Sequence, residues 1–393
     1  MLTKIYYRIM LNVVITTYID MLFTYRLMRE KERGGIMILC LADNDFMELM
    51  NNPQLHLPMR WNGKNFETAL ADVLDTYVSE LRSFYESGQE TENCYGVRVD
   101  IPQISSICSE IKSCVQEYHN GFPARAFLIL SQIMSNLINA PLDMYHKNGT
   151  SETIREDELR LYRIRKVDCG ITYNREDIFH VPVSARSMIS TCRYSIAGYP
   201  SLYLTTSLKL GLEETTESRK KSIAARFKLK RDQQKIDIQV LELGIKPQDF
   251  LEQRRPDNEN GRIVPHSTLR SQPVRENYLK WYPIIAACSF IRANRSAPFA
   301  SEYIIPQLLM QWIRTQSKRD RLMGIRYFSC ASIRASEMGY DYVFPVNNCD
   351  YKGNFCTVLR DAFVLTKPVF LRDYEKDGQC EEALNRMQDL DKI

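Results

Sequence analysis

The sequence predicts an α+β protein in which an all-helical region precedes a region built on a mixed or antiparallel sheet. Two observations lead to this class. Between residues 37 and about 150, apolar residues recur every three or four positions, which is the period of amphipathic helices. After residue 159, short apolar runs alternate with turn residues, which is typical of strands. The length of 393 residues also favours two domains, because single cores rarely grow to this size.

Three helices are expected in the first domain, residues 37–150. The clearest covers 66–85, where apolar side chains fall on one face and Asn65 suits the N-cap. A second helical pattern covers 104–118 and is ended by the turn sequence HNGFP. A third runs over 124–139. No catalytic cluster stands out in this domain, so its role is left open.

The second domain is expected to span residues 159–375. Its strand candidates are LYRIR, IFHVPV, SLYLTT, AARFKL, IDIQVLEL, GIRYFSC, YDYVFPV and AFVLTKPVFL. One helix interrupts them at PQLLMQWIRTQ, where Pro306 suits the first turn. The polar sequence HKNGTSETIRED is predicted to link the two domains, and residues 376–393 are predicted to be a C-terminal tail.

The first 36 residues form an unusual segment. They are fairly apolar, but Asp20 and the flanking arginines make a poor membrane span, and no small-residue cleavage site indicates a signal peptide. The sequence ERGG ahead of Met37 is compatible with a purine-rich ribosome-binding sequence in the coding strand. Residues 1–36 are therefore expected to be a translated leader or a disordered segment, with Met37 as the natural start.

Composition argues against several classes of function. The net charge of +4 is small for a protein that binds nucleic acid through its overall charge. Eleven cysteines without a CxxC spacing indicate reduced thiols in the cytoplasm rather than a secreted disulfide framework. Cys192 has no histidine placed to activate it and is interpreted as structural. The five histidines lie far apart, so no metal site is expected, and no membrane association is expected either.

One basic segment, residues 217–232, carries seven Lys and Arg in sixteen positions. Such a run is usually an exposed loop followed by an edge strand that lysines protect from unwanted pairing. It also suits the binding of a phosphate-bearing ligand or of nucleic acid. The sequence leaves both interpretations open.

A more specific motif lies in the second domain. The stretch RYSIAGYPSLYLTTSLKLGLEET, residues 193–215, follows LYRIR and is itself followed much later by GIRYFS. This order resembles the RES family, which is named for an arginine, a glutamate and a serine. The resemblance spans residues 159–370. It implies a fold similar to ADP-ribosyltransferases and the activity of the family's toxins, which consume NAD⁺.

The resemblance implies which residues would bind NAD⁺. Arg163 matches the first family arginine, with Arg165 as a second candidate, and Arg193 matches the second arginine. Both would hold phosphates, because a guanidinium can bond two phosphate oxygens at once. Tyr203 matches a strand tyrosine that packs on nicotinamide or ribose. Ser195, which stands where the family commonly has an asparagine, is counted among the NAD⁺-binding residues.

The catalytic residues implied by the resemblance are Arg193, Glu214 and Ser329. Glu214 matches because it lies eleven residues after Tyr203, although Glu213 is adjacent and stays an alternative. Positive charge develops on the ribose as nicotinamide leaves, so a nearby carboxylate stabilises the transition state.

The implied function is cleavage of the nicotinamide–ribose bond of NAD⁺, by a phosphorylase or glycohydrolase that acts as a toxin or defence effector. NAD⁺ is the substrate, inorganic phosphate is a candidate co-substrate, and no bound cofactor or metal is expected. A protein acceptor would make the chain an ADP-ribosyltransferase. Non-catalytic sensing of NAD⁺ or ADP-ribose is the alternative, and action on nucleic acid through the basic segment is a third option. An antitoxin or inhibitor protein is the expected partner.

Overall fold

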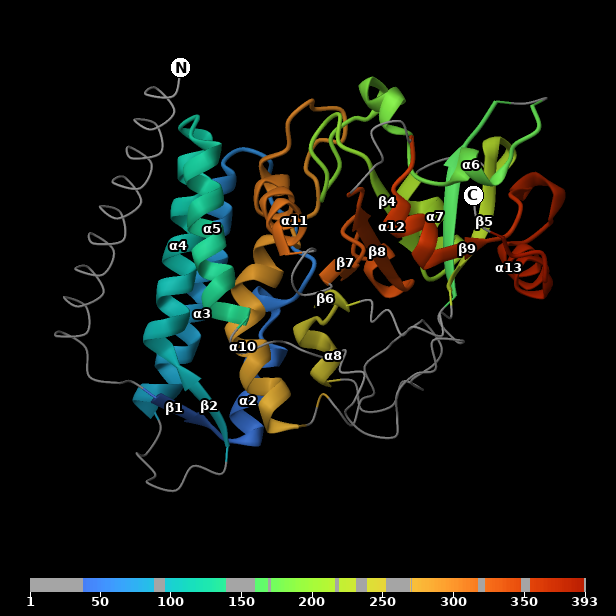
Figure 1. Cartoon of the computed structure of the whole chain (residues 1–393). Coiled ribbons are helices and arrows are strands. Elements are labelled where there is room, and N and C mark those ends of the chain that lie inside the picture. The colour runs from blue at the N-terminus through green and yellow to red at the C-terminus, as the bar shows by residue number, and fades with distance from the viewer. Residues whose placement is uncertain are drawn as a thin grey trace, which may run out of the picture.

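The computed structural model describes residues 38–87, 96–138, 160–168, 171–215, 219–230, 239–251, 269, 271–316, 322–347 and 354–391. These parts combine helices with one large sheet, as expected for an α+β protein (Figure 1). The predicted leader at residues 1–36 and the predicted linker HKNGTSETIRED lie outside the described residues.

The three predicted N-terminal helices are present. They are α3 (Phe66–Ser87), α4 (Ile101–His119) and α5 (Pro123–Ile138), and a shorter helix, α2 (Asp43–Asn51), precedes them. The long helices pack against one another and form a helical layer at one side of the molecule (Figure 1). Each buries one apolar face, as the sequence period predicts.

The expectation of an all-helical N-terminal region is wrong in one respect. Two short strands, β1 (Ile38–Leu41) and β2 (Val97–Asp100), pair as an antiparallel two-stranded sheet. In β2, Val97 and Val99 are buried and Arg98 is exposed, which is the two-residue period of a strand. A run of four residues is too short for its period to be distinguished from that of a helix by sequence alone.

The large sheet has the strand order β10-β5-β3-β4-β8-β7-β6, and β9 also pairs with β5. Among the described strands, β6 and β7 pair in parallel and the other neighbours are antiparallel, so the predicted mixed sheet is confirmed. The strands are β3 (Leu161–Lys166), β4 (Ser201–Thr205), β5 (Ser222–Leu229), β6 (Gln239–Leu243), β7 (Leu322–Phe328), β8 (Tyr340–Pro345), β9 (Phe363–Leu365) and β10 (Val369–Phe370).

One predicted strand, IFHVPV, is absent. A short helix, α6 (Arg175–Ile178), ends at its first residue, and a 3₁₀ helix (Val183–Met188) begins at its last. The buried His180 ring between them accepts a hydrogen bond of 2.9 Å from the backbone N–H of Cys356. This segment is therefore buried through the contact between His180 and Cys356 and not through strand pairing.

The basic segment is not the edge strand that was expected, because β5 lies between β3 on one side and β9 and β10 on the other. Its arginines bind the C-terminal part of the chain. Arg219 forms a salt bridge with Asp377, and Arg226 donates to the carbonyl oxygens of Asn385 at 3.0 Å and Met387 at 2.9 Å. These contacts favour a structural role for the two arginines.

Residues 376–393, predicted to be a tail, contain the helix α13 (Asp377–Arg386). This helix packs against α7 (Leu208–Thr215) and against β5. Cys380 and Leu384 lie four residues apart on its buried face, where both side chains are fully covered. The prediction of a tail is therefore wrong for this segment.

Two helices connect the N-terminal helices to the sheet. One is α11 (Ile304–Gln316), which the sequence predicted; the other is α10 (Gln272–Ala287), which it did not, and Pro283 lies inside α10. In Figure 1 both run between the helical layer and the sheet; α11 contacts α4, α5 and β7, and α10 contacts α4 and β2. The Tyr77 hydroxyl donates to the Leu279 carbonyl at 2.7 Å. The N-terminal helices and the sheet therefore share one hydrophobic core.

The remaining described helices are α8 (Pro247–Leu251) and α12 (Thr357–Ala362). No helix in the described part of the chain is long and apolar enough to span a membrane. Cys40 is disulfide-bonded, which the expectation of reduced thiols did not include. Seven other described cysteines are free: Cys108, Cys114, Cys192, Cys288, Cys330, Cys356 and Cys380.

Candidate functional site

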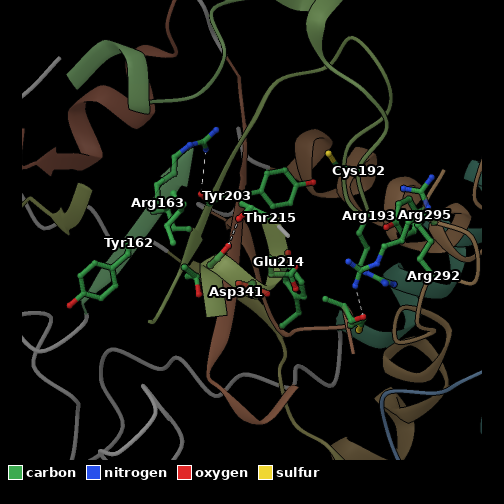
Figure 2. A pocket seen from close by; sticks show the side chains of 18 of the residues that line it. Tyr162, Arg163, Cys192, Arg193, Tyr203, Glu214, Thr215, Arg292, Arg295 and Asp341 are labelled. Atoms are coloured by element: carbon green, nitrogen blue, oxygen red, sulfur yellow. Dashed lines mark hydrogen bonds between the residues drawn. The ribbon is translucent and has the colours of Figure 1, made fainter. Parts of the chain in front are cut away.

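A cavity of about 430 Å³ lies beside the centre of the large sheet, a size typical of small-molecule sites. Its walls come from β3, β4, β7, β8, α7 and three loops (Figure 2). In Figure 2, Arg163 stands at one end and Arg193, Arg292 and Arg295 stand at the other, with Glu214 and Asp341 between them. The charged and aromatic lining residues are Arg163, Arg193, Arg292, Arg295, Glu214, Asp341, Tyr162, Tyr203, Tyr303 and Tyr327.

Arg193, predicted from the motif, lies in the turn before β4 and lines the cavity. Its guanidinium donates to the carbonyl oxygens of Cys288 at 3.0 Å and Phe290 at 2.9 Å. The same group lies over the Tyr303 ring, 5.0 Å from the ring centre. These contacts hold the charge in one orientation at the cavity wall.

The segment that binds Arg193 is itself held by the N-terminal region. The Met59 backbone donates to Ser289 at 3.0 Å and accepts from Ile291 at 2.8 Å. The Trp61 indole N–H donates to the Ile291 carbonyl at 3.2 Å. The N-terminal region thus forms part of the support for the cationic end of the cavity, a role that its sequence did not reveal.

Two further arginines at this end were missed by sequence reasoning. The guanidinium of Arg292 lies over the Tyr303 ring at 5.2 Å, and Arg295 donates to the Ala331 carbonyl at 3.0 Å. Both lie in the loop sequence IRANRSAP, just after α10. Two arginines three residues apart are the only sign of this site in the local sequence. The fold then brings both of them close to Arg193.

Arg163 on β3 stands at the opposite end of the cavity, whereas Arg165 is not among the lining residues. Arg165 instead donates to the Asp177 carbonyl oxygen. Burial, together with the charge of Arg165, lowers the pKa of Arg163 to about 10, so Arg163 stays charged at neutral pH. Its Nη1 donates to the Tyr203 carbonyl at 3.3 Å, and its Nε is buried without a hydrogen-bond partner among the described residues.

Glu214, near the end of α7, lines the cavity, and Glu213 does not. Ser329 Oγ donates a hydrogen bond to Glu214 Oε1. Ser329 itself is fully buried and is not part of the cavity wall, so it acts on the site through Glu214. The structure therefore brings together the arginine, glutamate and serine of the predicted motif.

Close packing of α7 positions Glu214. A Cβ added at Gly211 would lie 2.8 Å from Ile164 Cδ1, closer than real Cβ atoms approach, and 3.0 Å from Thr205 Cγ2, tighter than most real contacts. Glycine therefore lets the helix lie directly against β3 and β4. Glu214 follows three residues later on the same face of the helix, which points it at the cavity.

Tyr203 also lines the cavity, but Ser195 does not. The two hydroxyl oxygens are 2.8 Å apart, and the Tyr194 N–H donates to the Tyr203 hydroxyl at 3.3 Å. Ser195 Oγ also donates to Ser201 Oγ at 2.8 Å. Ser195, predicted to contact NAD⁺, is thus placed behind Tyr203, where it fixes the phenol.

Asp341 on β8 is a second carboxyl group in the cavity that sequence reasoning missed. It is only 5% exposed, and burial together with the charge of Glu214 raises the pKa of Asp341 well above its usual range. A single acidic residue inside the apolar run YDYVFPV was the available signal. An acidic side chain is costly to bury, so its presence in such a run favours a functional role.

Cys192 lines the cavity as well. Burial raises the pKa of the thiol, although the charges of Arg163 and Arg292 act against that rise. The thiol is therefore neutral at pH 7 and a weak nucleophile, in agreement with a structural interpretation. Within the described residues, no group of three or more His, Cys, Asp and Glu side chains could hold a metal ion.

The arrangement suits a ligand that carries both anionic groups and a centre of developing positive charge. Guanidinium groups at the two ends can bind phosphates, and the tyrosines offer flat apolar faces. The carboxylate between them can stabilise a cationic centre.

Comparison with known proteins gives one informative relative. Over 377 aligned residues the chain is 24% identical to a protein of Bacillus subtilis (strain 168) described as "Putative toxin YopC". The match covers 90% of this chain and 77% of the relative, so it includes both the N-terminal helices and the sheet. No protein-family model matches the chain, and no solved structure matches it. The resemblance to the RES family therefore rests on the motif residues.

Proposed function

We propose that this chain is a toxin that degrades NAD⁺ by cleaving the bond between nicotinamide and ribose. The observation that carries the proposal is the position of Glu214, which accepts a hydrogen bond from Ser329 and lies between Arg163 and a group of three other arginines in one cavity. The similarity to a protein described as a toxin supports the biological role. The order of the motif residues, which resembles that of the RES family, supports NAD⁺ as the substrate.

In the proposed reaction, the guanidinium groups of Arg163 and Arg193 bind the anionic parts of NAD⁺ and fix its orientation. The ring of Tyr203 packs on nicotinamide or ribose. Nicotinamide leaves as a neutral molecule and needs no acid, while positive charge develops on the ribose. The Glu214 carboxylate stabilises that charge, and its hydrogen bond with Ser329 keeps it in place.

The acceptor is either water or inorganic phosphate in this proposal. Attack by water gives ADP-ribose, and attack by phosphate gives ADP-ribose 1″-phosphate; nicotinamide leaves in both cases. A protein acceptor would give an ADP-ribosylated side chain. A toxin with this activity also needs restraint in its own cell, and we propose an inhibitor protein as the partner.

The test uses the purified full chain with NAD⁺, in phosphate buffer and in a buffer without phosphate. Released nicotinamide is quantified, and the second product is identified by its mass. The proposal predicts nicotinamide release in at least one buffer, and the product mass identifies the acceptor. Tight NAD⁺ binding in calorimetry without release in either buffer would refute catalysis and favour a sensing module. Release of nicotinamide without covalent attachment of ADP-ribose to an added protein would argue against a protein acceptor.

A further inference from the structure

Asp341 is a carboxyl group to which the motif assigns no role. In the sheet it is the register partner of Thr205 on β4 and of Tyr327 on β7, and its side chain reaches the cavity. There it lies beside the side chain of Glu214, and its Oδ2 atom is buried without a hydrogen-bond partner among the described residues (Figure 2). The cavity therefore contains a pair of acids.

Two neighbouring carboxyl groups, one of them with a buried oxygen that has no donor among the described residues, are most stable when one of them keeps its proton. An ionised carboxylate can only accept hydrogen bonds, so one of the pair must supply the proton. Two ionised carboxylates at this separation would also repel each other strongly. Asp341 is the better place for the proton, because it is 5% exposed, whereas Glu214 is exposed at the cavity.

We propose that Asp341 is a positioning residue for Glu214, which it holds by keeping its proton and donating a hydrogen bond to the Glu214 carboxylate. Glu214 also accepts a hydrogen bond from Ser329 Oγ, so two donors from two different strand ends fix one carboxylate. Glu214 then faces the ligand ionised and in a single orientation. The effect of Asp341 on turnover rests on the proposed function. The proposal that Asp341 keeps its proton beside Glu214 does not.

The other groups near Asp341 are consistent with this assignment. Glu214, Thr205 and Arg193 shift the pKa of Asp341. The charge of Asp341 in turn shifts the pKa values of Tyr327 and Cys330. Burial and Glu214 raise the pKa of Asp341, whereas the Thr205 hydroxyl and the charge of Arg193 lower it, and the net direction is upward. Burial also raises the pKa of Tyr327 and of Cys330, so both stay neutral beside it.

The first test measures thermal stability against pH for wild type and Asp341→Asn. The amide of asparagine can donate to Glu214 but cannot ionise. Because the pKa of Asp341 is raised in the folded state, wild type loses stability as the pH rises from the unfolded-state pKa towards the folded-state pKa. Asp341→Asn should therefore melt at a higher temperature than wild type at neutral pH. The gain should vanish as the pH falls to about 4, and it should shrink in a Glu214→Gln background.

The second test measures nicotinamide release by Asp341→Asn and by Asp341→Leu, which has the same branching and number of side-chain heavy atoms but no donor. The asparagine variant should keep kcat within about threefold, and the leucine variant should lose about tenfold or more with little change in the KM for NAD⁺. Wild type should lose kcat at alkaline pH, and the asparagine variant should not.

Two results would overturn the assignment: an asparagine variant that melts no higher than wild type at neutral pH, or a leucine variant that folds and turns over as wild type does. If wild type releases no nicotinamide, the proposed function fails, and the melting curves alone decide whether Asp341 holds the proton. If the leucine variant fails to fold, the melting and pH profiles of the asparagine variant still give the answer.

Discussion

Replacing Ser329 by alanine removes one hydrogen bond that fixes the Glu214 carboxylate. Ser329 is fully buried at the end of β7, and its hydroxyl donates to Glu214 Oε1. Ser329 Oγ also accepts a hydrogen bond from the Ala331 backbone N–H at 3.2 Å. The substitution changes the volume little, so its effects come from the two lost hydrogen bonds.

The magnitude follows from these contacts. A hydrogen bond to a charged group contributes about 1.5–3 kcal/mol, and about 1.4 kcal/mol corresponds to a tenfold change in rate. Because Asp341 remains as a second donor in our proposal, we expect the lower end, a loss of about tenfold in kcat. The unsatisfied N–H of Ala331 should lower the free energy of unfolding by about 1–3 kcal/mol.

The assay is steady-state nicotinamide release by Ser329→Ala, with Ser336→Ala as the matched control. Ser336 is a buried serine on the next turn whose hydroxyl donates to the Ile333 carbonyl at 2.7 Å, outside the cavity lining. Its loss should cost stability and leave kcat unchanged. The reasoning is refuted if Ser329→Ala keeps the wild-type kcat, or if both variants lose kcat equally.

Three other predictions concern the walls of the cavity. Arg163→Met should raise the KM for NAD⁺ by tenfold or more in steady-state assays, because its pKa of about 10 leaves it charged at neutral pH; an unchanged KM would exclude it from binding. Trp61→Phe loses the bond to the Ile291 carbonyl and should raise the same KM several-fold without unfolding the chain, whereas a pure loss of melting temperature would show a structural role only. Cys192→Ala should keep kcat, and burial should make the wild-type thiol react slowly with iodoacetamide at pH 7 and faster as the pH rises; fast alkylation at neutral pH would contradict the raised pKa.

Local patterns were sufficient to predict much of the fold. The strand containing Arg163 and the turn, strand and helix that carry Arg193, Tyr203 and Glu214 each have a strong period or a specific turn sequence, and the structure has them at those places. The motif spacing also selected Glu214 over Glu213, in agreement with the cavity lining.

The rest depends on contacts between distant segments. Arg292 reaches the cavity because the segment after α10 binds the Arg193 guanidinium, and Asp341 reaches it because β8 pairs with β4; no local pattern shows either contact. The helix α10 itself contains Pro283, which is unfavourable in a helix interior and hides the pattern. The support that Met59 gives to the segment next to Arg193 comes from backbone bonds, and these leave no signature in the side-chain sequence.

The central claim is that the Glu214 carboxylate drives cleavage of NAD⁺, and one comparison tests it most directly. Nicotinamide release is measured for wild type, Glu214→Gln and Glu213→Gln, each shown to be folded by its melting curve. Glu213 is the matched control, because it is the adjacent glutamate on α7 and does not line the cavity. We predict release by wild type and Glu213→Gln, and a loss of at least about a hundredfold in Glu214→Gln. Equal release by all three proteins, or a loss confined to Glu213→Gln, would contradict the account.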